Sequence, residues 1–144
     1  MRVLLDTNVL AGGMTGEIRG SIRPPSQLWR RWRAKQFDLI VSAHLLDELE
    51  RTLSTAWFRE RTTPDAIAVL LRDVRDNAIF VEPIDEVRGI ASHWQDDLVL
   101  AAAVSGKADY LVTGDAKFRR VGEYLGVKLC TPAEFLNELD ELSF

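Results

Sequence analysis

The sequence has 144 residues, a formal net charge of −4 and a hydrophobic fraction of 47%. This length suits one domain with its own core, and the apolar content argues against disorder. No run of about 18 apolar residues occurs, which argues against a membrane span, and the first apolar run is too short for a signal peptide. The single cysteine, Cys130, cannot form an internal disulfide and suits a reducing cytoplasm, where we expect the protein.

The first third of the chain predicts two strands and two helices. Residues 3–5 form an apolar run that predicts a buried strand, and Asp6 follows it directly. The glycine-rich residues 11–22 predict a loop, and a helix is expected over residues 26–36. Residues 37–41 predict a second strand. Ser42 is then expected to cap a helix whose leucines keep helical spacing.

The rest of the chain continues the alternation. Thr63 followed by Pro64 predicts the start of a helix that runs to about residue 76. Strands are expected over residues 78–81, 110–112 and 127–130, and residues 97–105 predict a buried helix because they are mainly apolar. Thr131 and Glu134 predict a capping box for a last helix. The pattern predicts one domain over residues 1–144, of class α/β, with three α/β/α layers around a mostly parallel sheet of about five strands.

Carboxylates follow the predicted strands. Asp6 ends the first strand, Asp115 follows the strand at 110–112, and Asp96 and Asp97 open the buried helix. All of these places can share one edge of a parallel sheet, the edge where ligands bind. Two unit charges ~4 Å apart repel by about 4 kcal/mol at an effective dielectric of 20, so such a cluster needs protons or a cation. Mg²⁺ or Mn²⁺ suits a site made of oxygen atoms.

Structural interpretations compete with this one. Asp96 or Asp97 fits the N-cap of a helix, and Asp115 fits a turn. The helix after Ser42 carries three further acids, and the spacing of its leucines does not choose among them: Asp47, Glu48 and Glu50. A zinc site is not expected, because neither histidine has a second ligand at the usual spacing.

Four segments in order resemble the motifs of the PIN-domain ribonucleases, specifically the VapC-like toxins of bacterial and archaeal toxin–antitoxin pairs. They are residues 3–10 (VLLDTNVL), 41–49 (VSAHLLDEL), 96–103 (DDLVLAAA) and 108–115 (ADYLVTGD). The resemblance covers nearly the whole chain and implies a PIN-like fold. Single segments are weakly specific, whereas four in order at suitable spacing are fairly specific.

The resemblance implies roles for individual residues. It makes catalytic residues and metal ligands of four acids: Asp6, Glu48, Asp96 and Asp115. It makes supporting groups of Asn8, Thr113 and Asp97. Close relatives often carry another Asp three residues before the third acid, and this chain has His93 there. The doublet at 96–97 leaves the third acid open, and the spacing to Leu100 favours Asp96.

The resemblance further implies an Mg²⁺- or Mn²⁺-dependent endoribonuclease that hydrolyses RNA phosphodiester bonds, as the toxin of a toxin–antitoxin pair. The implied partners are RNA, a cognate antitoxin and a second copy of the chain. The alternative is a non-catalytic PIN-like module that binds RNA or protein. Trp57 and Phe58 fit either a dimer contact or the core, with the core favoured.

A basic segment stands out in this acidic chain. It is expected to hold the RNA backbone, or else to dock an acidic partner or form a solvated helix face. Its residues are Arg19, Arg23, Arg30, Arg31, Arg33 and Lys35.

Overall fold

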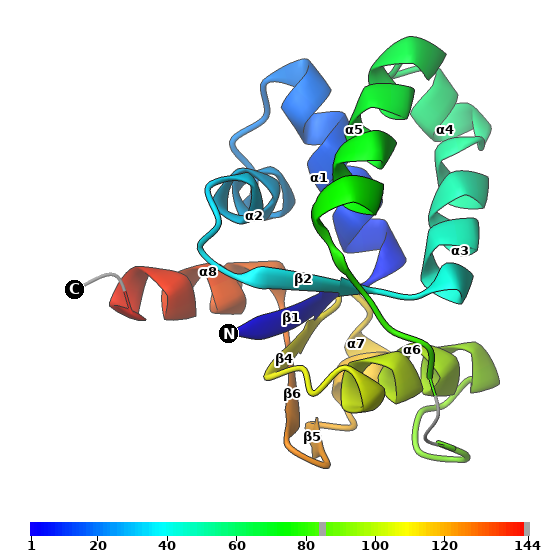
Figure 1. Cartoon of the computed structure of the whole chain (residues 1–144), viewed down its shortest axis with the longest axis vertical. Coiled ribbons are helices and arrows are strands. Elements are labelled where there is room, and N and C mark those ends of the chain that lie inside the picture. Colours follow the sequence, from blue (N-terminus) through cyan, green and yellow to red (C-terminus); the bar gives the residue numbers. More distant parts are fainter. Residues whose placement is uncertain (84–85, 143–144) are drawn as a thin grey trace.

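Residues 1–83 and 86–142 are described by the computed structural model, in which strands and helices alternate (Figure 1). The strands are β1 (Arg2–Leu5), β2 (Asp38–Val41), β3 (Ile79–Phe80), β4 (Tyr110–Val112), β5 (Glu123–Tyr124) and β6 (Val127–Cys130). The helices are α1 (Thr7–Arg19), α2 (Pro24–Arg33), α3 (Ala43–Leu53), α4 (Ala56–Arg59), α5 (Pro64–Asn77), α6 (Trp94–Ser105), α7 (Ala116–Arg119) and α8 (Pro132–Leu142).

The strands form one sheet in the order β3-β2-β1-β4-β6-β5. Every pair is parallel except β5 and β6, which form an antiparallel hairpin. Helices α1, α2, α3 and α5 lie on one side of the sheet in Figure 1, and α6 lies on the other. The predicted three-layer α/β/α architecture is therefore confirmed. The sheet has six strands instead of about five, because the short β5 forms an additional strand at one edge.

Residues 11–19 belong to helix α1, so the predicted loop over residues 11–22 was wrong there and correct only for residues 20–22, which follow the helix. Two glycines of this helix, Gly13 and Gly16, permit close packing of α1 on α2. A Cβ atom added to Gly13 would lie 2.7 Å from the backbone oxygen of Pro25, and one added to Gly16 would lie 1.6 Å from Oγ of Ser26. Glycine usually weakens a helix, but here the missing side chains let the next helix approach.

Gly13→Ala is expected to lower the free energy of unfolding by about 1–3 kcal/mol, because the new methyl group collides with backbone atoms that cannot rotate away. Gly12→Ala is the matched control. Its Cβ would meet Pro25 at 3.8 Å, an ordinary contact. In this helical position alanine is expected to stabilise by about 0.5–1 kcal/mol. Urea unfolding of both variants measures the difference, and equal stabilities would contradict this packing account.

Three predicted caps are present, and they fix where helices begin. Oγ of Ser42 accepts a hydrogen bond from the Leu45 N–H at 3.2 Å, which starts α3 directly after β2. Oγ1 of Thr63 accepts from the Ala66 N–H in the same way. Thr131 and Glu134 exchange the two bonds of the predicted capping box. Helix α6 begins at Trp94, three residues before the predicted start.

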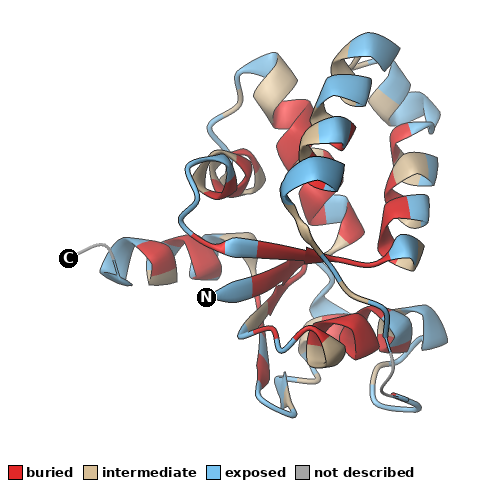
Figure 2. Ribbon diagram, in the orientation of Figure 1, coloured by how far each residue is buried: buried red, intermediate tan, exposed pale blue. Residues whose placement is uncertain are grey.

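The core fills the spaces between the sheet and its two helical layers, where Figure 2 shows the buried residues. Cys130 is buried there, as expected. The preference for placing Trp57 in the core was wrong, since its side chain is 54% exposed, while Phe58 is partly buried against the core. No helix in the described ranges has both the length and the apolar character needed to cross a membrane.

Candidate functional site

Asp6 is held in a fixed orientation at the carboxyl end of β1. Its backbone N–H donates to the carbonyl of Val112 at 2.9 Å, which ties it to the neighbouring strand β4. Its Oδ1 accepts from the Thr7 N–H and its Oδ2 from Oγ1 of Thr113, each at 2.8 Å. Each carboxylate oxygen thus has one donor, and two such bonds restrict the rotation of the group.

Thr113 and Asp115 extend this network from the end of β4. The side chain of Thr113 is fully buried, and its Oγ1 also accepts from the Asp115 N–H at 3.1 Å. Asp115 is exposed and caps the short helix α7, because its Oδ1 accepts from the Lys117 N–H at 2.9 Å. Asp115 is therefore the N-cap of a short helix and not the turn residue that the structural interpretation expected. Its charge nevertheless acts on Asp6 and Asp96.

The two acids of the doublet at the start of α6 have different surroundings. Asp97 is buried and accepts hydrogen bonds from three backbone N–H groups of the preceding segment, those of Gly89 (2.9 Å), Ile90 (3.3 Å) and Ala91 (2.8 Å). Asp96 is half-buried and interacts electrostatically with the other acids at the sheet edge. Asp97 therefore anchors a loop, whereas Asp96 belongs to the acidic cluster.

The acids of α3 are also separated by their surroundings. Glu48 is half-buried and close enough to Asp6 and Asp96 to raise the pKa of both carboxyl groups. Glu50 is ion-paired with Arg75 of α5. Asp47 is exposed. The three-dimensional structure thus separates Glu48 from Glu50 and Asp47, which the leucine spacing could not do.

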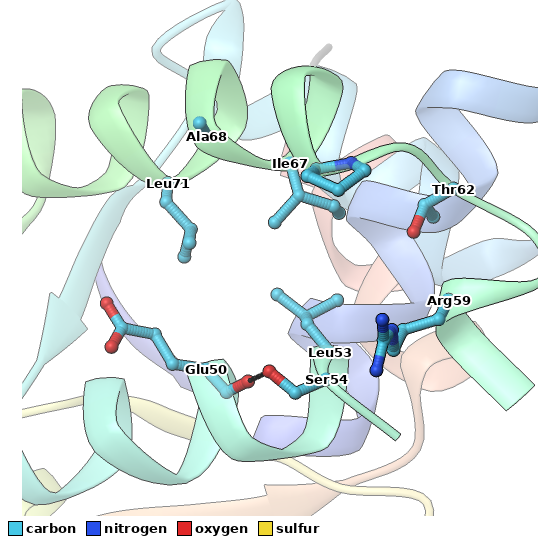
Figure 3. Close-up of a pocket in the computed structure, with 9 residues that line it drawn as sticks. Glu50, Leu53, Ser54, Arg59, Thr62, Ile67, Ala68 and Leu71 are labelled. Carbon is cyan, nitrogen blue, oxygen red and sulfur yellow. Dashed lines mark hydrogen bonds between the residues drawn. The ribbon is translucent and has the colours of Figure 1, made fainter. Parts of the chain in front are cut away.

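Glu50 lines a different pocket, between α3, α4 and α5 (Figure 3). This cavity of about 580 Å³ is partly apolar, because side chains such as Leu53, Ile67 and Leu71 line it. Asp6, Glu48, Asp96 and Asp115 are not among its lining residues. It is therefore distinct from the acidic cluster.

Burial and mutual repulsion raise the pKa values of two acids in the cluster. The pKa of Asp96 rises from its ordinary 3.8 to about 6, mainly through burial and then through the charges of Asp6 and Asp115, with His93 opposing the rise. Burial also raises the pKa of Asp6, against the hydrogen bonds from Thr113 and Thr7 that lower it. Perturbed carboxyl groups of this kind are common at functional sites.

The donor chemistry of this cluster fits a hard divalent cation. Its four acids offer oxygen ligands, the type that Mg²⁺ and Mn²⁺ prefer. Over residues 1–83 and 86–142, no three His, Cys, Asp or Glu side chains already lie close enough together to hold one ion. Mg²⁺ usually keeps several waters and binds through one or two carboxylates, so its chemistry does not require a preformed cage. Asn8 is exposed in the first turn of α1, next to Thr7.

Asp96→Asn is expected to stabilise the metal-free protein at pH 7. The raised pKa means that the folded state binds a proton more tightly than the unfolded chain, so stability falls as pH rises from about 4 to about 6. A shift from 3.8 to about 6 corresponds to at most about 3 kcal/mol, and solvent screening of this partly exposed group reduces that to about 1 kcal/mol. Thermal unfolding in EDTA should show the gain at pH 7 and none at pH 4. A gain of equal size at both pH values would exclude the electrostatic cause.

Three arginines of the basic segment form ion pairs with neighbouring elements. Arg30 pairs with Glu17 at 3.0 Å, Arg31 with Asp140, and Arg33 with Asp73 at 3.5 Å. These pairs connect α2 to α1, α8 and α5.

The end of the basic segment lies far from the cluster in the topology. Lys35 lies in a hollow with Asp38, the first residue of β2, whereas Asp6 follows the last residue of the parallel β1. These are opposite edges of the sheet. Contact of the basic segment with RNA stays a prediction, and its ion pairs favour a structural role for Arg30, Arg31 and Arg33.

Together, the fold and the cluster define an α/β protein with acidic groups gathered at the carboxyl ends of parallel strands. The family model described as "PIN domain" matches residues 2–117, and the chain belongs to this family. No curated protein matches the sequence. The structure is similar to a chain in the crystal structure of VapBC2 from Rickettsia felis bound to a DNA fragment from their promoter. The TM-score is 0.59 at 18% identity, over 91% of this chain and 98% of the other.

Sequence reasoning missed one group of residues next to the cluster. Arg51 of α3 and Trp94 of α6 line a groove that also includes Glu48. They come from helices far apart in the sequence, and neither belongs to a regularly spaced series of apolar residues. Only the fold brings them together.

Proposed function

We propose that this chain is a divalent-metal-dependent endoribonuclease that hydrolyses RNA phosphodiester bonds. One observation carries the proposal: the electrostatic coupling of four acids at the carboxyl edge of the sheet in a chain of the PIN-domain family. The acids are those expected from the sequence, Asp6, Glu48, Asp96 and Asp115. Such a concentration of negative charge is costly unless a cation offsets it.

Asp6, Asp96, Glu48 and Asp115 would hold the metal. Thr7 and Thr113 donate to Asp6, which orients its carboxylate and opposes the rise in its pKa that burial causes. When bound, a divalent ion supplies a water of lowered pKa and offsets charge on the phosphate.

The acids of the cluster have a second consequence for substrate binding. Without a cation they repel the phosphate backbone of RNA, because both carry negative charge. Binding of RNA at this edge is therefore linked to binding of the cation. In this proposal Asp97 acts indirectly, by holding the segment 89–91 beside the first turn of α6.

The biological role proposed is that of a cytoplasmic toxin with an antitoxin partner. The support is the fold shared with a chain of the Rickettsia felis VapBC2 complex, together with the family. A homodimer is part of the same proposal. A small neighbouring gene for a DNA-binding antitoxin would support this role.

The direct test is incubation of the purified protein with single-stranded RNA in Mg²⁺, in Mn²⁺ and in EDTA. The expected result is cleavage in either metal and none in EDTA, with cleavage restored when metal is added back. RNA binding without cleavage in either metal would favour the non-catalytic module instead. A preparation of Asp6→Asn made in parallel controls for contaminating nucleases.

A further inference from the structure

A groove of about 630 Å³ opens beside the acidic cluster, between α3 and the first turn of α6. Its lining residues are His44, Glu48, Arg51, Thr52, Thr55, Trp94 and Gln95. Glu48 belongs both to this groove and to the cluster, so the groove leads directly away from the proposed site of chemistry. The first turns of both helices lie on the same side of the molecule in Figure 1.

Trp94 offers an aromatic surface at this place. Its side chain is 68% exposed, although it stands two residues before Asp96 in the first turn of α6. Trp29 and Trp32, by contrast, are buried and pack edge to face at 5.2 Å. Trp94 thus contributes little to the core, and an exposed ring beside a nucleic-acid site is suited to stacking with a base.

Arg51 offers a positive charge in the same groove. It follows Glu48 by three residues on α3, so the two side chains are neighbours on one helix face. In the described part of the chain Arg51 has no carboxylate at ion-pair distance, whereas Arg75 is paired with Glu50. An unpaired guanidinium is suited to binding phosphate.

The remaining groove residues are polar, which argues against an apolar protein segment as the occupant. Thr52, Gln95 and His44 carry groups that donate and accept hydrogen bonds, and Trp94 is the one large apolar side chain among the residues that line the groove. A nucleotide presents the matching set of groups: a flat base, a sugar hydroxyl and a charged phosphate.

We propose that this groove binds one nucleotide of single-stranded RNA next to the cleaved bond, with its base stacked on Trp94 and its phosphate on Arg51. The proposal rests on the proposed function, because it names a substrate subsite of the same active site. Stacking on an open ring requires an unpaired base, so the groove selects single-stranded over duplex RNA.

The test measures KM and kcat for a single-stranded RNA oligonucleotide in Mg²⁺, together with its affinity by fluorescence anisotropy. Trp94→Ala and Arg51→Ala should each weaken binding and raise KM by about tenfold, with kcat within about threefold of wild type. Trp94→Phe should stay within about threefold in KM, because a ring is retained. The matched controls Trp57→Ala and Arg72→Ala, on α4 and α5, should change neither quantity.

The two proposals fail in different ways. Cleavage with a KM that changes less than about twofold in Trp94→Ala overturns the groove and leaves the nuclease intact. Affinity that depends on Trp94 without any cleavage overturns the nuclease and supports the groove. If Trp94→Ala does not fold, Arg51→Ala decides, and a KM that changes less than about twofold in that variant overturns the groove. Weakened binding of a protein partner with unchanged RNA affinity overturns the groove as an RNA site.

Discussion

Asp6→Asn is expected to lower kcat/KM for RNA cleavage by more than about 100-fold. Loss of a group that merely supports a metal ligand typically costs 10–100-fold, and here a proposed ligand itself loses its charge. Asparagine keeps the shape: its Oδ1 can still accept from the Thr7 N–H, and its Nδ2 can donate to the Thr113 hydroxyl in place of the bond that Oδ2 accepts, so the fold is expected to persist. Steady-state cleavage of single-stranded RNA at saturating Mg²⁺ measures the effect.

Thr113→Val provides a graded comparison for Asp6. It removes the hydroxyl that donates to Oδ2 of Asp6 but nearly preserves the volume of this buried side chain. We expect kcat/KM for RNA cleavage to fall by about 10–100-fold, less than in Asp6→Asn. Wild-type activity in Asp6→Asn would disprove the metal mechanism. Wild-type activity in Thr113→Val alone would show that the orientation of Asp6 does not depend on this bond.

The second large effect separates the neighbours Asp96 and Asp97. Asp96→Asn is expected to lose more than about 100-fold in kcat/KM while remaining folded, because it removes a charge from the proposed cation site. Asp97→Asn is expected to keep activity within about tenfold per folded molecule and to lose about 2 kcal/mol of stability, because its carboxylate holds three backbone N–H groups.

Activity and urea unfolding of both variants, measured on the same preparations, test this separation. Asp96→Asn is expected to lose activity without losing stability. Asp97→Asn is expected to lose stability and to keep most of its activity. If Asp97→Asn is inactive and fully stable while Asp96→Asn is active, the third acid has been assigned to the wrong residue.

The sequence predicted best those features that depend on neighbouring residues. Ser42, Thr63 and Thr131 were recognised as caps because an N-cap needs only a side-chain oxygen and the next three residues. The apolar run ending at Asp6 likewise marked a buried strand and its tip. The glycines of α1 misled the prediction because their reason is tertiary: they admit α2, and Gly13 cannot be recognised as a packing position before Pro25 is placed beside it.

The composition of the candidate site depended partly on three-dimensional packing. Periodicity left Glu48 and Glu50 as equals, and the resemblance to PIN-domain ribonucleases chose Glu48. In the structure the charge of Glu48 acts on Asp6 and Asp96, whereas Glu50 pairs with Arg75, a residue 25 positions later. The groove of Arg51 and Trp94 had no sequence signal, because exposed residues on separate helices follow no common period.

The most direct test of the central claim is a titration with Mn²⁺ by isothermal calorimetry, using wild type, Asp6→Asn and Glu50→Gln. Glu50→Gln is the matched control, because it removes a carboxylate of the same helix that is engaged by Arg75 instead of facing the cluster. We expect saturable binding by wild type and Glu50→Gln, and affinity at least about tenfold weaker in Asp6→Asn. Equal Mn²⁺ affinity in wild type and Asp6→Asn would contradict a divalent-cation site at the end of β1.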